Sequence, residues 1–104
     1  MSEFKAYQFL ELLKQLPFVE SIYLYGSRAR GDNRPRSDID LAIGAPQASW
    51  RDWLKVEDII ENADTLLEID CIHLEQVKDQ QFLKNIMKDK LTLFKRSPND
   101  GRNN

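Results

Sequence analysis

Two aspartates, Asp38 and Asp40, stand two residues apart in the sequence SDIDL and are the residues most suited to chemistry. Side chains on a β-strand alternate between its two faces, so both carboxylates would leave the same face. The residues between and after them, Ile39, Leu41 and Ile43, are apolar and predict that the opposite face is buried. Carboxylates at this spacing can hold a pair of hard cations about 3.5–4 Å apart. The pattern therefore predicts a reaction assisted by divalent metal ions.

A third carboxylate, Asp70, lies in a second apolar segment, LEIDCIHL. If Ile69 faces the core, alternation places Asp70 on the same open side as the first two aspartates. Three carboxylates on adjacent strands repel each other unless cations lie between them. We therefore expect two Mg²⁺ ions, with Asp38 and Asp40 binding both, and Asp70 binding the ion beside an attacking hydroxyl whose proton it can accept. Glu68 is a weaker candidate for the same site.

A Gly-Ser turn with two arginines precedes the aspartates, at Gly26, Ser27, Arg28 and Arg30. Glycine lets the backbone approach a phosphate closely, and N–H groups at a helix start attract anions. With a nucleoside triphosphate, two Mg²⁺ ions and both arginines, the site would carry a charge of about -1, whereas without the metals and arginines it would carry about -7. A Gly-Ser turn, a pair of arginines or a pair of aspartates is common on protein surfaces when it occurs alone. The combination of all three indicates a triphosphate site.

Hydrophobic periodicity and turn residues predict the elements that position these residues. Helices are predicted over residues 2–15, 49–63 and 79–88, with a short helix or turn through Arg30. Strands are predicted over residues 18–25, 38–43, 66–74 and 91–94. This order indicates an α/β (α+β) fold, a small mixed sheet with helices on one face. The other face is expected to stay open, because Asp38 and Asp40 point towards it.

The length of 104 residues indicates one domain, predicted over residues 1–96, with a disordered polar tail at 97–104. The formal net charge of -2 argues against general nucleic-acid binding. The single cysteine, Cys71, excludes an internal disulfide, and we interpret it and His73 as structural residues. An EF-hand is excluded because its later glycine and final glutamate are missing. No signal peptide or membrane-spanning run is visible, so we expect a cytoplasmic protein without membrane contact.

The motifs GSRARG and SDIDL, followed by Asp70 within a strand, closely resemble the polymerase-β-like nucleotidyltransferase superfamily. The compact length resembles its minimal nucleotidyltransferase (MNT) branch. The resemblance implies an enzyme that takes a Mg²⁺-bound nucleoside triphosphate, releases pyrophosphate and passes a nucleoside monophosphate to a hydroxyl. It also implies that the Gly-Ser turn with its arginines binds the triphosphate, and that the three aspartates bind the metals.

Larger members of the superfamily carry a further domain for the acceptor, so here we expect the acceptor on a separate partner. In the MNT branch that partner is typically a HEPN-domain protein, and the pair resembles a toxin–antitoxin system. The resemblance implies that this chain is the antitoxin and transfers AMP from ATP to a tyrosine of the HEPN toxin. Two alternatives stay open: a binding module that neutralises its partner by contact, through exposed aromatics such as Trp50 and Phe94, or a free-standing enzyme acting on a small hydroxyl compound. No motif selects the nucleotide base.

Overall fold

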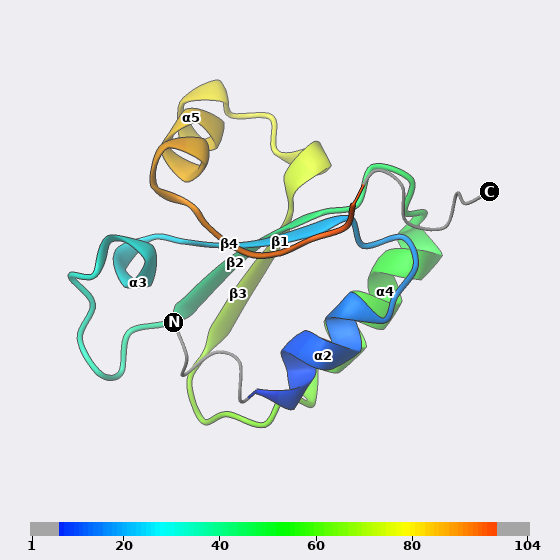
Figure 1. Ribbon diagram of the computed structural model, residues 1–104, viewed down its shortest axis with the longest axis horizontal. Coiled ribbons are helices and arrows are strands. Elements are labelled where there is room, and N and C mark those ends of the chain that lie inside the picture. Colours follow the sequence, from blue (N-terminus) through cyan, green and yellow to red (C-terminus); the bar gives the residue numbers. More distant parts are fainter. Residues whose placement is uncertain (1–6, 98–104) are drawn as a thin grey trace.

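The computed structural model describes residues 7–97, which form a four-stranded sheet between helices (Figure 1). In chain order the elements are α2 (Gln8–Lys14), β1 (Ser21–Tyr25), α3 (Ser27–Arg30), β2 (Ile39–Gly44), α4 (Trp50–Glu61), β3 (Ile69–His73), the 3-10 helix η1 (Leu74–Gln76), α5 (Gln80–Asp89) and β4 (Leu91–Lys95). The strand order is β3-β2-β1-β4. Strand β1 is antiparallel to β2 and β4, whereas β2 and β3 are parallel. The predicted class, a small α+β fold with a mixed sheet, is confirmed.

The main core lies between one face of the sheet and the helices α2 and α4 (Figure 1). Alternate residues of the central strands, among them Leu24 and Leu41, are fully buried and form one cluster with Leu13 of α2 and Val56 of α4. Each such side chain contributes about 1.5–3 kcal/mol when it is buried. This core fixes the orientation of β2, so Asp40 must lie on the opposite face.

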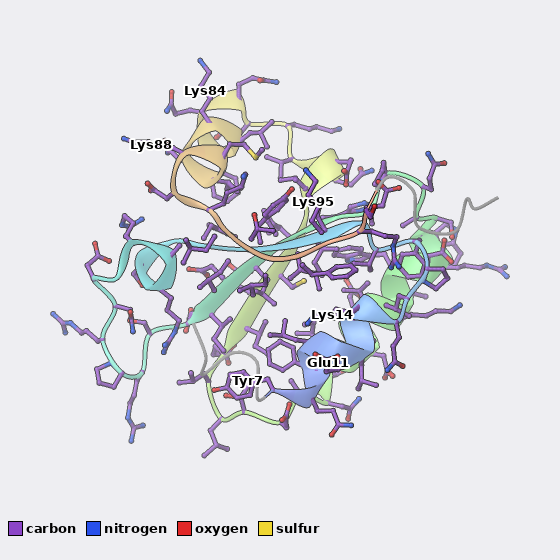
Figure 2. All side chains as sticks on the ribbon, viewed as in Figure 1. Tyr7, Glu11, Lys14, Lys84, Lys88 and Lys95 are labelled. Atoms are coloured by element: carbon purple, nitrogen blue, oxygen red, sulfur yellow. The ribbon has the colours of Figure 1, made fainter. Side chains whose placement is uncertain are left out.

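The opposite face is covered in part by α5, which corrects the expectation that helices lie on one face only. Ile86 of α5 is buried against Tyr23 and Ala42. On the same helix, Lys84 and Lys88 point away from the sheet (Figure 2). The periodicity of α5 predicts an apolar stripe, but a stripe does not specify which face of a sheet it covers. The alanine on β2 leaves room for the helix over the middle of that face.

The start of α4 agrees with the prediction and the start of β3 differs from it, each for a local reason. Helix α4 begins as predicted, since the Ser49 hydroxyl accepts from the Asp52 N–H and the Asp52 carboxylate accepts from the Ser49 N–H. Strand β3 starts at Ile69 instead of residue 66. The Leu67 N–H donates to Thr65 Oγ1 at 3.1 Å, and this turn keeps the preceding residues out of the sheet.

Two expectations fall on parts of the chain outside the described residues. They are the start of the first helix, in residues 1–6, and the polar tail from residue 98 onward. Within residues 7–97, no helix has the length and apolar character that crossing a bilayer requires.

Candidate active site

Tyr25, Asp40 and Asp70 form a row across three neighbouring strands. Tyr25 of β1 pairs with Asp40 of β2, and Asp40 pairs with Asp70 of β3 in the parallel register. Paired residues project to the same side, and neighbouring strands lie about 4.8 Å apart. The structure therefore brings Asp40 and Asp70 together on the face opposite the buried side chains of Ile39 and Leu41.

Asp38 is exposed and lies one residue before β2, at the end of a polar loop. Its charge nevertheless acts on Asp40. Burial, followed by the carboxylates of Asp70 and Asp38, raises the pKa of Asp40, while Arg28 and Arg30 act in the opposite direction. Asp40 is thus the partly buried member of an acidic cluster, and a bound cation would relieve its repulsion.

The donor set fits hard divalent cations, because Asp38, Asp40 and Asp70 supply the carboxylate oxygens that Mg²⁺ prefers. In the part of the chain that the structure describes, however, no three acidic, histidine or cysteine side chains are grouped closely enough to hold an ion. Since Asp38 and Asp70 are exposed, their side chains can rotate towards an ion without a movement of the sheet.

The backbone at Gly26 comes up against the carboxylate of Asp40. Gly26 has φ 76° and ψ -154°, a conformation open almost exclusively to glycine. A Cβ added there would lie 2.5 Å from Asp40 Oδ2. The Gly26 carbonyl oxygen accepts from the N–H groups of Ala29 and Arg30, which closes the first turn of α3. Ser27 begins this helix immediately after the contact, so the Gly-Ser turn and Asp40 are neighbours.

Arg28 holds the loop that leads to Asp38. Its side chain is buried, and its Nε and Nη2 donate to the Ser37 carbonyl oxygen at 3.1 and 2.8 Å. Nη2 also donates to the Pro35 carbonyl oxygen at 3.0 Å. A planar guanidinium suits such a pair of acceptors, whereas an ammonium group does not. These contacts give Arg28 a positioning role that the sequence alone does not indicate; its predicted contact with a triphosphate stays a prediction.

Replacing Arg28 with Ala is expected to cost about 1.5–3 kcal/mol, because it removes hydrogen bonds from a charged, buried donor. Arg28→Lys should lose most of the same stability, since it cannot serve both carbonyl oxygens. Arg30→Ala is the matched control. Urea unfolding measures the stability, and limited trypsin digestion after Arg36 measures the loosening of the loop. If Arg28→Ala unfolds at the same urea concentration as Arg30→Ala, Arg28 does not hold this loop.

Arg30 is exposed and points towards other surface groups. Its Nε pairs with Asp32 at 3.1 Å and its Nη1 with Asp89 of α5 at 3.7 Å. Exposed pairs of this kind contribute little to stability, because solvent screens them. Arg30 therefore tethers α3 loosely to α5, and its role in triphosphate binding stays a prediction.

Tyr25 lies beside the candidate site, in register with Asp40. Burial raises the pKa of its hydroxyl, and the charges of Asp40 and Asp70 raise it further. Its ring packs edge-on against Phe82 of α5, with centroids 5.9 Å apart. Tyr25 thus contacts Phe82 of α5 through its ring and lies close enough to Asp40 and Asp70 to respond to their charges. The signal available in the sequence is its place as the last strand residue before the Gly-Ser turn.

Cys71 and His73 lie on the core face, away from the carboxylates. The His73 ring stacks on Trp53 of α4 with centroids 4.5 Å apart, and its Nε2 lies 2.9 Å from the Ala45 carbonyl oxygen. Burial raises the pKa of the Cys71 thiol to about 12, and the charge of Asp70 adds to this effect. Both residues have packing contacts, in agreement with their interpretation as structural residues.

The chain thus combines a mixed sheet, a Gly-Ser turn that opens a short helix, and carboxylates beside that turn. The family profile "Polymerase beta, Nucleotidyltransferase" matches residues 8–99. This chain belongs to the polymerase beta nucleotidyltransferase family.

Solved structures share this fold. A chain of a toxin–antitoxin solved with AMP-PNP superposes with a TM-score of 0.60 at 22% identity, covering 88% of this chain and 73% of that chain. A chain of the toxin–antitoxin MntA–HepT superposes with a TM-score of 0.59 at 19% identity, and the match covers 89% of this chain and 71% of that chain. A candidate nucleotidyltransferase from Sulfolobus solfataricus superposes with a TM-score of 0.56 at 24% identity, and the match covers 86% of this chain and 76% of that chain. A search of curated proteins finds no match.

Proposed function

We propose that this chain is a cytoplasmic antitoxin that transfers AMP from ATP to a tyrosine hydroxyl of a HEPN-type toxin. Membership of the nucleotidyltransferase family supports the reaction class. The similarity to chains of toxin–antitoxin structures, one of them solved with AMP-PNP, supports the nucleotide and the kind of partner. The observation that carries the proposal is the approach of the Gly26 backbone to Asp40, which is itself in register with Asp70.

The place of each residue suggests its role. The turn at Gly26 and Ser27 would hold the triphosphate through its backbone N–H groups, because the missing Cβ of Gly26 lets this turn lie directly against Asp40. Asp38 and Asp40 would bind two Mg²⁺ ions, with Asp70 completing one of the two ligand sets. When bound, Mg²⁺ would offset the charge of the triphosphate and polarise its α-phosphate.

The reaction forms one bond and breaks one bond at the α-phosphorus of ATP. The hydroxyl oxygen of the acceptor bonds to this phosphorus, and the bond to the oxygen of the leaving pyrophosphate breaks. The hydroxyl proton passes to the Asp70 carboxylate, which is exposed and can be reached by an acceptor on another protein. Tyr25 and α5 cover the opposite end of the carboxylate row, at β1.

Intact-mass measurement tests the proposal. The purified chain is incubated with ATP, Mg²⁺ and the helical protein encoded beside it. We expect the partner to gain the mass of AMP on a tyrosine, with the chain acting well below stoichiometric amounts, and we expect no gain with Asp38→Asn. A partner that stays unmodified while the chain neutralises it would contradict the proposed transfer. The same spectrum gives the number of nucleotides added.

A contact-only antitoxin is the second candidate, and the exposure of Trp50 favours it. This side chain is 70% exposed on α4, whereas Phe94 packs partly against the core. Contact alone predicts that Asp38→Asn still inhibits the partner at equal concentration and leaves no covalent mark. Modification of a small hydroxyl compound by the isolated chain would instead favour a free-standing enzyme.

A further inference from the structure

A continuous groove runs between α4 and the open edge of the sheet at β3. Hollows of about 310, 340 and 510 Å³ follow one another along this edge. The first two share the lining residues Ile60 and Ile69, and the second and third share Trp53 and Glu57, so the three are continuous. Among the described strands β3 pairs only with β2, which leaves one row of its backbone N–H and C=O groups facing outward.

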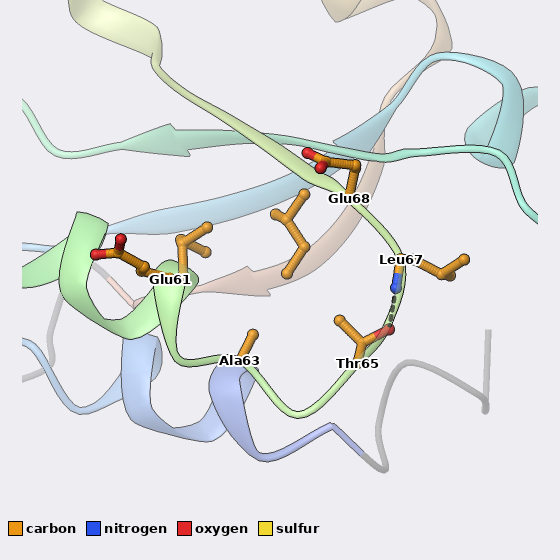
Figure 3. A pocket seen from close by; sticks show the side chains of 7 residues that line it. Glu61, Ala63, Thr65, Leu67 and Glu68 are labelled. Carbon is orange, nitrogen blue, oxygen red and sulfur yellow. Dashed lines mark hydrogen bonds between the residues drawn. The ribbon is translucent and has the colours of Figure 1, made fainter.

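The groove has an apolar floor and an acidic rim. Side chains such as Ile60, Ile69 and Cys71 form the floor. Glu57 and Glu61 of α4, together with Glu68 and Asp70, are the charged residues of its lining, and no Lys or Arg of the described chain lines any of the three hollows. Figure 3 shows the Glu61 and Glu68 carboxylates on α4 and on the strand side of the first hollow.

The far end of the groove exposes further apolar surface. Trp50 and Leu54 line the third hollow and are 70% and 51% exposed. The opposite sheet edge differs, because β4 carries Lys95 and is preceded by Lys90, and lysines at an edge discourage pairing with another chain. Strand β3 contains neither a lysine nor a proline to prevent pairing.

We propose that this groove binds an extended segment of a partner protein, which adds to β3 as a further strand and carries Lys or Arg among apolar side chains. Backbone hydrogen bonds to the outer edge of β3 would hold the segment, its apolar side chains would cover Ile69 and Cys71, and its cations would meet Glu57 and Glu61. Because Asp70 lies at the same strand, the docked segment would pass beside the carboxylate site. The inference concerns contact alone and does not depend on nucleotidyl transfer.

The charges favour such a partner over a second copy of this chain. Pairing β3 with β3 of a second copy would bring the acidic rims of both grooves together, and like charges across paired strands are destabilising. Pairing β3 with β4 of a second copy would leave an open edge at each end and would grow into filaments. A basic, extended segment of a partner complements the acidic rim, and its binding causes neither repulsion between like charges nor growth into filaments.

A synthetic peptide in which Lys alternates with Val and Ile serves as the probe. We expect it to bind the full chain more tightly as the salt concentration falls, and to slow hydrogen exchange of the outward amides of β3. Exchanging both Glu57 and Glu61 for Gln should weaken binding about threefold to thirtyfold. The matched control exchanges Glu11 and Glu20, which are exposed elsewhere, and should bind as the unchanged chain does.

Two altered peptides separate strand addition from general charge attraction. Replacing each Lys of the peptide by Glu should abolish binding, and so should N-methylation of alternate backbone amides, which removes strand pairing and keeps the charge. Full binding by the N-methylated peptide, an equal effect of the control variant, or unchanged exchange at β3 would overturn the proposal. So would no detectable binding, or sedimentation that shows self-association through β3.

Discussion

Asp40→Asn should abolish nucleotidyl transfer and leave the chain folded. The substitution keeps the shape of the side chain but removes the central charge of the row formed with Asp70, so we expect the rate to fall by about a hundredfold to a thousandfold or more. Burial and the charges of Asp70 and Asp38 raise the pKa of Asp40, which means that its charged form is disfavoured in the folded state. Removing this charge should therefore leave the melting temperature unchanged or slightly raised.

Transfer of label from ATP to the partner measures the rate, and thermal unfolding measures the stability. Asp32→Asn is the matched control, because Asp32 is an exposed aspartate that pairs with Arg30 on the outside of α3. It should keep its transfer activity. An Asp40→Asn variant that retains most of the activity would remove Asp40 from the reaction.

Gly26→Ala should impair both the fold and the reaction. Its backbone conformation is strained for any residue with a Cβ, at a cost of about 1–3 kcal/mol. The added Cβ would also lie 2.5 Å from Asp40 Oδ2 and would displace this carboxylate from its place. We therefore expect lower stability in urea together with a loss of transfer comparable to that of Asp40→Asn.

Gly31→Ala separates these two effects. Gly31 also has a positive φ, 86°, but nothing lies within 4 Å of a Cβ placed there. This variant should lose about 1–2 kcal/mol to backbone strain and keep its activity once it is folded. If Gly26→Ala is as active as Gly31→Ala at equal folded fraction, the approach of Gly26 to Asp40 has no part in catalysis.

Features encoded within one element can be predicted from the sequence. The apolar residues Ile39, Leu41 and Ile43 fix which face of their strand is buried, and the same alternation around Ile69 places Asp70 on the open side. The Ser49 cap and the glycine after the first strand are local signals too. These features suffice for the fold class and for a candidate site, because each depends on residues only a few positions apart.

Features that depend on contacts between distant segments cannot be predicted in this way. Periodicity shows that α5 has an apolar face, but only the packed structure shows that Ile86 lies against Tyr23 and Ala42. The pairing of Asp40 with Asp70 depends on the register of two strands that α4 separates in sequence. Arg28 could equally extend into solvent, and its hydrogen bonds to a loop nine residues away emerge only in three dimensions.

Binding of a non-hydrolysable ATP analogue, followed through the backbone amide resonances of the full chain, tests the central claim most directly. We predict that the resonances of Gly26, Ser27 and the residues around Asp40 and Asp70 shift only when Mg²⁺ is present, and that Asp40→Asn removes this response. Shifts that do not require Mg²⁺, that persist in Asp40→Asn, or that lie on α2 and not at the Gly-Ser turn would contradict a nucleotide site at these carboxylates.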